Sequence, residues 1–283
     1  QLEQLIEDNS KCSLPQMLST ERPDKAANHI LSGRVVVIVN GSPYVLIMPC
    51  VFVDFLSSAE DPNLKFQYAN LLKFVRLVAF FITLLLPELY VAITNFHQEI
   101  IPTVLLFAIV ASRESIPFPI IVEILAMEIS FELIREASLR VPSPIGTTIG
   151  IIGALILGQA AVEASIVSPI LIIIIAITGI TSFAIPDFYL SFHLRIVRFL
   201  YTIAGFLAGF LGIGIVLFGH LILLCSLKSF GVSYLAPYIP STGKNNKSYF
   251  MPPFWNREKR PDFLNTKRPK KEERISMKWK YQV

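Results

Sequence analysis

The stretch Ser112-Arg-Glu-Ser-Ile-Pro-Phe-Pro decides the fold, because it opens a run of charged side chains between segments that otherwise read as lipid-soluble. That run lies within residues 112–169 and contains Glu123, Glu128, Glu132, Arg135 and Glu136. Ionisable groups inside a bilayer are costly and usually functional. An interfacial helix whose charges face water is the alternative. We call the glutamate-rich part of this run the acidic helix and interpret the rest of the chain in relation to it.

The composition places the chain among integral membrane proteins. Of its 283 residues, 53% are hydrophobic and 16% are charged, and the mean hydropathy of +0.58 is too apolar for an ordinary soluble domain. Its three cysteines and four histidines are scattered without a CxxC pair, so we predict no disulfide framework, no metal site and no cofactor. The sequence holds no GxSxG, HExxH or comparable catalytic motif, which predicts that the chain is not an enzyme.

Residues 1–70 read as the C-terminal part of a cytoplasmic α/β domain, followed by a linker at Glu60-Asp-Pro-Asn. Two β-branched runs, 34–39 and 44–48, flank Asn40-Gly-Ser-Pro, and Asn-Gly between such runs is a strong hairpin signal. Both runs are almost wholly apolar, so we expect interior strands. Because two strands do not make a stable sheet alone, we also expect further sequence upstream.

Residues 71–226 are predicted to form the transmembrane domain, an α-helical multi-pass membrane bundle. Four segments suit full spans of about 20 residues: 74–93, 145–162, 166–186 and 199–225. Residues 100–111 are a short run containing Pro102 and suit a re-entrant or broken helix. The amphipathic, Glu-rich acidic helix, around 118–134, either lies outside the hydrocarbon or crosses despite its glutamates.

Lysines and arginines indicate the orientation. They gather before residue 77, at 113–140, at 195–198 and in the tail, whereas the turns at 94–99 and around Glu163 hold none. We therefore place the N-terminal region and the tail, residues 227–283, on the cytoplasmic side. The number of complete crossings is then even, either four or six.

The acidic helix concentrates its charges on one side. At 100° per residue, four of them fall within an arc of roughly 100°: Glu128, Glu132, Arg135 and Glu136. Glu123 lies opposite. Spacing allows Glu132 to pair with Arg135, and Glu136 with Arg140. We expect either an amphipathic helix on the membrane surface or a helix turned towards water inside an assembly.

The helix predicted next has two distinct faces. Small residues every four positions form a ridge on which another helix can pack closely: Gly146, Gly150, Ala154 and Gly158. A mixed polar and apolar face suits a pore wall with an apolar gate: Thr148, Ile152, Leu155, Gln159 and Glu163. The alternatives are a ridge that only packs and polar residues that merely mark a membrane boundary.

The tail is basic, since residues 241–283 hold twelve Lys or Arg against four Asp or Glu, a net charge of +8. This composition favours anionic lipid headgroups or a partner. We predict no nucleic-acid binding, because no recognised binding motif accompanies the charge.

Several blocks of sequence, in order over most of residues 1–240, resemble the GerA family, the A subunits of bacterial spore germinant receptors. They are Ser19-Thr-Glu-Arg-Pro-Asp, Gly33-Arg-Val, Asn40-Gly-Ser-Pro-Tyr-Val-Leu-Ile-Met-Pro, Ala111-Ser-Arg-Glu-Ser-Ile-Pro-Phe-Pro, Glu132-Leu-Ile-Arg-Glu-Ala, Pro144-Ile-Gly, Gly158-Gln-Ala-Ala-Val-Glu-Ala and Ser226-Leu-Lys-Ser-Phe-Gly-Val. Position 163 is often glutamine in similar proteins, and the tail departs most from the family pattern.

The resemblance implies a multi-pass protein of the bacterial spore inner membrane with a larger cytoplasmic region upstream. It also implies a transporter-like B subunit and a lipoprotein C subunit as partners, and a homo-oligomer that forms a nutrient-gated ion channel and triggers germination by ion release. One alternative is a germination-modulating spore membrane paralogue outside a receptor complex. Another is a secondary transporter, although no inverted repeat is present.

Overall fold

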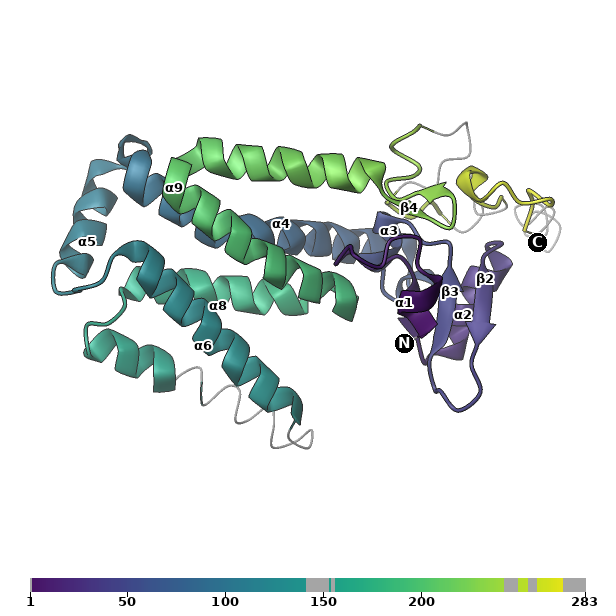
Figure 1. The fold of residues 1–283 in the computed structure, drawn as a ribbon, viewed down its shortest axis with the longest axis horizontal. Helices are drawn as coiled ribbons and strands as arrows, with labels where there is room; N and C mark the ends of the chain where they lie inside the picture. Colours follow the sequence, from purple (N-terminus) through teal and green to yellow (C-terminus); the bar gives the residue numbers. More distant parts are fainter. Residues whose placement is uncertain (1, 141–152, 154–155, 242–248, 254–258, 272–283) are drawn as a thin grey trace, which may run out of the picture. The chain divides into compact units, whose positions relative to one another are not determined.

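The computed structural model describes residues 2–140, 153, 156–241, 249–253 and 259–271, which form two compact units (Figure 1). We call the first the sheet unit; it comprises Gln1–Val78, Ile185–His193 and Gly219–Val283. The second is the helical unit, which comprises Ala79–Ala184 and Leu194–Phe218. Helices α4 and α9 contribute residues to both units.

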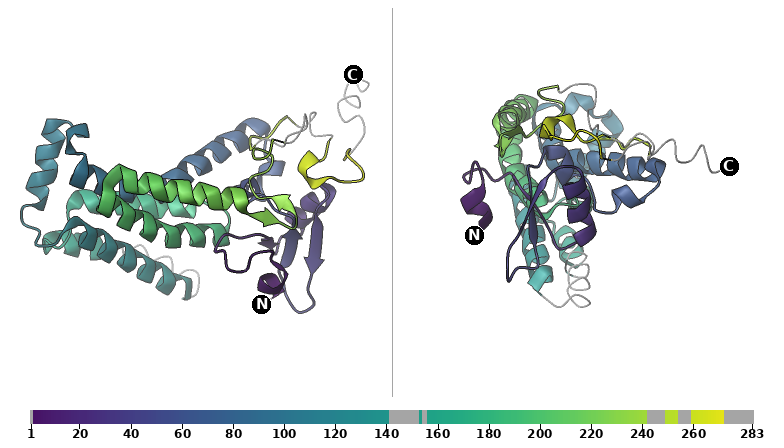
Figure 2. Two further views of the ribbon diagram at one scale, coloured as in Figure 1. Left: turned by 45° about the horizontal axis from the view of Figure 1, so that its top comes forward. Right: turned by 90° about the vertical axis from the view of Figure 1, so that its right-hand side faces the viewer.

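The sheet unit contains a small antiparallel sheet. Its strands are β1 (Leu18–Thr20), β2 (Val35–Ile38) and β3 (Val45–Met48), in the order β1-β3-β2. The helix α2 (Pro23–Leu31) contacts all three strands, and these elements are among the purple segments in Figure 2. The unit also contains the short helices α1 (Leu2–Ile6) and α3 (Phe52–Phe55). The predicted hairpin is confirmed, because β2 and β3 pair with Val35 opposite Met48 and Ile38 opposite Val45.

Only β3 is an interior strand, so the expectation that both runs are interior was wrong for β2. Val35 and Ile38 are 58% and 78% exposed, whereas Leu46 and Ile47 are buried. The reason is sheet order: within the described residues, β2 has a strand partner on one side only. An apolar run therefore does not guarantee a central position.

A buried ion pair holds the end of this hairpin. The Arg34 guanidinium lies 2.5 Å from the Asp54 carboxylate, which also accepts a hydrogen bond from the Val51 backbone N–H at 3.0 Å. The Cys50 thiol lies beside the guanidinium, and burial raises its pKa to about 12. Cys50 therefore remains protonated at physiological pH and is a poor nucleophile.

The segment that follows α9 returns to the sheet unit. It forms the two-stranded pair β4 (Lys228–Ser229) and β5 (Val232–Ser233). The Ser229 hydroxyl accepts from the Cys50 N–H at 3.0 Å and donates to the Gln16 carbonyl at 2.7 Å. The buried Tyr234 hydroxyl donates to the Pro15 carbonyl at 2.8 Å. Chain segments separated by more than 200 residues thus share one core.

The described part of the basic tail also folds onto this unit. Tyr249 and Lys73 exchange hydrogen bonds at 2.9 and 2.7 Å, and Met251 and Asn70 exchange two at 3.1 and 2.7 Å. These contacts place the tail against the first turns of α4. The predicted linker is ordered too, as Asp61 in the turn η1 (Asp61–Asn63) is buried and pairs with Arg76.

The helical unit consists of packed helices joined by short turns. They are α4 (Phe66–Phe96), the turn η2 (Gln98–Ile100), α5 (Thr103–Arg113), α6 (Ile120–Arg140), a helical stretch at 156–163, α8 (Pro169–Phe183) and α9 (Phe188–Ser226). The acidic helix is therefore α6. Its core with α4 and α8 includes the buried side chains of Val91, Ile124 and Leu171.

The prediction of four full spans was wrong. Within the described residues, two helices are long and apolar enough to cross a membrane, judged by length and composition alone: α4 has 31 residues and α9 has 39, and the mean hydropathies of their most apolar 18-residue stretches are 2.1 and 2.4. Helix α8 has only 15 residues, about 22 Å at 1.5 Å per residue, which is short of a hydrocarbon core of about 30 Å. Most of the predicted span 145–162 lies outside the described residues.

Helix α9 reverses direction at Ala208 and Gly209, so the segment 199–225 is not one straight span (Figure 1). Gly209 has φ +58° and ψ −138° there. The two arms, 188–207 and 210–226, pack closely: a Cβ at Gly205 would lie 3.4 Å from the Ile213 side chain. Hydropathy counts apolar residues and does not detect this turn.

Replacing Gly209 by alanine is expected to destabilise the protein by about 1–3 kcal/mol, because an L-residue is strained at this backbone conformation. The new Cβ would also lie 3.2 Å from both Phe96 and His97. Gly214→Ala is the matched control, since nothing lies within 4 Å of its Cβ position and alanine favours helix. Thermal denaturation in detergent should show a lower Tm for the first and an unchanged or higher Tm for the second. Equal Tm values would contradict the turn.

Candidate functional site

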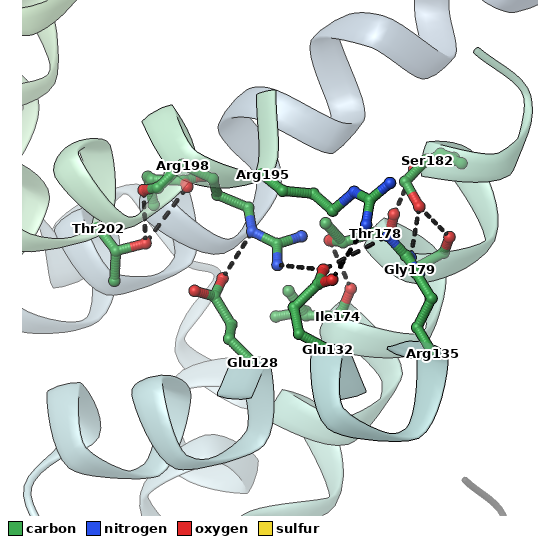
Figure 3. Close-up of polar contacts among 12 residues, drawn as sticks. Glu128, Glu132, Arg135, Ile174, Thr178, Gly179, Ser182, Arg195, Arg198 and Thr202 are labelled. Carbon is green, nitrogen blue, oxygen red and sulfur yellow. Dashed lines mark hydrogen bonds and ion pairs between the residues drawn. The ribbon is translucent and has the colours of Figure 1, made fainter. Parts of the chain in front are cut away.

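A network of charged side chains is buried where α6 faces the first arm of α9 in the helical unit (Figure 3). Glu132 lies at its centre, accepting from Arg195 and Arg135 at 3.3 Å each. Arg198 lies 3.1 Å from a Glu128 oxygen and 3.8 Å from Glu132. We call this the arginine-glutamate network. Two helices thus contribute opposite charges to one site.

Helical spacing places these residues on facing stripes. On α6, positions 128, 132 and 135 follow each other by four and three residues, and on α9 positions 195, 198 and 202 do the same in reverse order. Each trio therefore lines one side of its helix. The predicted pair of Glu132 with Arg135 is confirmed at 3.3 Å.

Helix α8 holds Arg135 from the other side. The guanidinium donates to the Ser182 hydroxyl at 2.7 Å and lies over the rings of Phe131 and Phe183, 5.0 and 4.7 Å from their centres. The Phe131 ring packs so tightly against Gly179 that a side chain at this glycine would clash with it. Cation–π contact and a hydrogen bond together fix the position of this arginine.

Glu88 of α4 extends the network. It is fully buried, and one carboxylate oxygen lies 3.3 Å from the Thr202 hydroxyl. Within the described part of the chain, its second oxygen has no hydrogen-bond partner. Glu128 is fully buried too, and its contact with Arg198 lacks hydrogen-bond geometry. The site combines three carboxylates and three guanidiniums: Glu88, Glu128, Glu132, Arg135, Arg195 and Arg198.

Glu123 belongs to a separate buried pair. Its carboxylate accepts from Arg113 at 2.8 Å and from the Ser168 backbone N–H at 3.2 Å. The Ser168 hydroxyl in turn caps α8 by accepting from the Leu171 N–H at 3.3 Å. This pair ties the end of α5 to the start of α8.

The predicted acidic face divides in the structure. Glu128 and Arg135 are buried and Glu132 is partly buried, whereas Glu136 is exposed. The interfacial interpretation, with all charges facing water, was therefore wrong for the first three. The Arg140 side chain, predicted to pair with Glu136, lies outside the described residues.

Most residues of the predicted pore face and ridge lie outside the described residues, namely Thr148, Ile152, Leu155, Gly146, Gly150 and Ala154. Gln159 and Glu163 are described, and both line a cavity of about 630 Å³ beside α8. Gly158 faces the same helix, since a Cβ there would lie 3.6 Å from the Ile172 side chain. The small face of this segment thus packs within the chain at Gly158.

Three members of the network were not predicted as site residues: Glu88, Arg195 and Arg198. Arg195 and Arg198 were assigned to the cytoplasmic side from the distribution of positive charge, but Arg198 is 3% exposed and lies among helices. Arg195, Arg198 and Thr202 are spaced by three and four residues, and this helical spacing is the sequence signal that could have identified the two arginines. Glu88 follows Pro87 inside an apolar helix, and an isolated carboxylate at such a place is a site candidate.

The model of a family described as Bacillus/Clostridium GerA spore germination protein matches residues 1–263. Spore germination protein KA of Bacillus subtilis is 46% identical over 93% of this chain and 49% of that protein. Spore germination protein GerLA of Bacillus cereus is 42% identical over 94% of this chain and 54% of its own length. The uncharacterized membrane protein YfkQ of B. subtilis is 42% identical over 92% and 51%.

The chain therefore spans about half the length of the curated relatives it matches. No solved structure matches it.

Proposed function

The chain belongs to the GerA family of spore germination proteins, and on this premise we propose that it is the membrane part of a germinant receptor A subunit. In this proposal several copies assemble in the bacterial spore inner membrane into a nutrient-gated ion channel. A transporter-like B subunit and a lipoprotein C subunit complete the receptor. Ion release through the channel starts germination.

The arginine-glutamate network is the observation that carries this proposal. Charges buried in an apolar helical unit are expensive to maintain unless they are paired, so they are seldom retained without a role. This network joins α6, α8 and α9 through partners on different helices. A sliding movement of α9 against α6 would exchange or break several pairs at once, which gives the unit two discrete arrangements rather than a continuum.

The ion path is proposed to follow the segment that carries Gln159 and Glu163. Both residues border the cavity beside α8, and Glu163 would attract cations at its mouth. In the same proposal, Ile152 and Leu155 form the apolar gate and Thr148 adds a polar position. The N-terminal region and the basic tail lie on the cytoplasmic side, where the tail meets anionic lipid.

The proposal is tested by ion flux through the intact protein in K⁺-loaded liposomes, with and without its partner subunits. We expect nutrient-dependent K⁺ efflux from the complete receptor. Glu163→Lys should reduce it severalfold, because the mouth would then repel the permeating cation. Glu136→Lys is the matched control, since this exposed glutamate lies outside the network, and it should leave efflux unchanged. No efflux from the complete receptor, or equal efflux from both variants, would contradict the proposal.

A further inference from the structure

A cavity of about 440 Å³ lies in the helical unit between the end of α4 and the short helix α5. Thr94, in the last turn of α4, and Gln98, in η2, form one wall. The wall on α5 consists of residues at positions i, i+3, i+4, i+7 and i+8, which lie on one side of a helix: Leu106, Ile109, Val110, Arg113 and Glu114. Ligand sites usually measure about 300–1,000 Å³, so this cavity suits a small group.

One end of the cavity carries two opposite charges next to each other. The Arg113 guanidinium uses one terminal nitrogen to donate to Glu123 at 2.8 Å, and its other N–H groups can donate to an anion. The Glu114 side chain is exposed and can accept from a cation. The Gln98 amide donates to the Thr94 carbonyl at 2.7 Å, and its own carbonyl oxygen adds a second acceptor. This end therefore complements a ligand that is both an anion and an ammonium ion.

The other end of the cavity is apolar, and apolar surface continues from it along α5. Leu106, Ile109 and Val110 line this end, and on the neighbouring side of the helix Val104 and Phe107 are 83% and 73% exposed. With 11 residues, α5 is about 16 Å long, much shorter than a hydrocarbon core of about 30 Å. A short helix with such exposed apolar side chains suits the boundary between lipid headgroups and acyl chains.

We propose that this cavity binds the headgroup of a zwitterionic phospholipid with a primary ammonium group, of the phosphatidylethanolamine class. The phosphate accepts charge-assisted hydrogen bonds from Arg113, and the ammonium donates to Glu114 and Gln98. The acyl chains lie along the exposed apolar side of α5. Phosphatidylglycerol has no ammonium for the glutamate, and the quaternary ammonium of phosphatidylcholine has no N–H to donate, so the lining favours the primary amine over both.

A lipid bound here would connect several helices. It joins the end of α4 to α5, and the Arg113–Glu123 pair continues the connection to α6 and, through the Ser168 N–H, to α8. Binding to the folded state alone stabilises that state. The site was not predicted from the sequence, because only the turn after α4 brings Thr94 and Gln98 to the α5 wall. This inference goes beyond the proposed germination function and does not depend on it.

The test is native mass spectrometry of the intact protein in detergent, titrated with short-chain phosphatidylethanolamine, phosphatidylglycerol and phosphatidylcholine. We expect wild type to bind phosphatidylethanolamine severalfold more tightly than the other two lipids. Glu114→Gln should weaken this binding about two- to fivefold, which is the usual effect of one exposed ion pair, and should not weaken phosphatidylglycerol binding. Glu99→Gln is the matched control, since this exposed glutamate of η2 does not line the cavity and should leave all three affinities unchanged.

A second pair of variants tests the cavity itself. Val110→Trp should fill it and abolish the preference for phosphatidylethanolamine, and this side chain is 56% exposed, so a larger one does not disturb the core. Val104→Trp, on the same helix but outside the lining, should keep the preference.

Three results would overturn the assignment. They are equal binding of the three lipids by wild type, equal phosphatidylethanolamine binding by wild type and Glu114→Gln, and binding of glycerophosphoethanolamine, the headgroup without acyl chains, as tight as that of the lipid. Failure of the liposome experiment would leave these measurements unaffected, so the two proposals are tested separately.

Discussion

Arg198→Ala is expected to lower the free energy of unfolding by about 3–5 kcal/mol, which is the usual loss when one partner of a buried ion pair is removed. The reason is what remains behind: Glu128 is fully buried with Arg198 as its ion-pair partner, and Glu88 and Glu132 lie near it. Three carboxylates would then face two guanidiniums. Most of the loss in stability comes from a buried carboxylate that no longer has a positive charge beside it, rather than from the lost contact alone.

Thermal denaturation of the protein in detergent measures this loss. Glu136→Ala is the matched control, because this glutamate directly follows Arg135 on the same helix but is exposed, and its Tm should stay near that of wild type. A double variant, Glu128→Gln/Arg198→Gln, should recover part of the lost stability, since neither side chain then carries a charge. Identical Tm values for Arg198→Ala and Glu136→Ala would show that the arginine-glutamate network does not stabilise the folded protein.

Arg34→Ala is expected to have an effect of similar size in the sheet unit, again about 3–5 kcal/mol. The Arg34 side chain is fully buried, and its loss leaves the Asp54 carboxylate, 6% exposed, without its guanidinium. Asp54 also caps the start of α3 through the Val51 N–H, so its disturbance propagates into the turn that follows the hairpin.

An exposed arginine provides the comparison for Arg34. The Arg22 side chain is 48% exposed and pairs with Asp24 and Glu60, so Arg22→Ala should change stability by only about 0–1 kcal/mol. Chemical denaturation of both variants, under one set of conditions, checks the difference. Equal losses of unfolding free energy in the two variants would mean that burial does not determine how much these ion pairs contribute to stability.

The sequence allowed good prediction of local features of the fold. Asn40-Gly between two β-branched runs predicted the β2-β3 hairpin, because that turn needs residues that tolerate positive φ, and Gly41 has φ +84°. The run 100–111, which contains Pro102, predicted a short helix, and the structure has the short helix α5 directly after this proline. Both signals act through the backbone of a few neighbouring residues, which is why one sequence suffices to read them.

The number of spans could not be predicted for a different reason. Hydropathy measures how many apolar residues follow each other, and it does not show whether the chain turns within such a run. The run 199–225 is mostly apolar, yet it reverses at Gly209, and 166–186 yields a helix of only 15 residues. Tertiary packing decides such turns, and a glycine inside an apolar run is at most a hint.

Only the α6 side of the candidate site was predicted from the sequence. Spacing on one helix identified Glu128, Glu132 and Arg135 as a common face, because helical geometry alone fixes their relation. It could not identify Arg195 and Arg198, more than 55 positions away, as the partners of that face. These arginines were used only to assign the cytoplasmic side, and the sequence does not show that opposite charges on two helices are buried together.

The most direct test of the central claim is K⁺ release from spores whose intact protein carries substitutions in the arginine-glutamate network. If the network holds the closed arrangement, Arg198→Gln spores should release K⁺ without nutrient, because Glu128 loses its partner and the closed state is weakened. Glu128→Gln/Arg198→Gln spores should return towards nutrient dependence, and Glu136→Gln spores should match wild type. Release from Arg198→Gln spores that remains nutrient-dependent and equal to wild type, with the protein present at normal levels, would contradict the account.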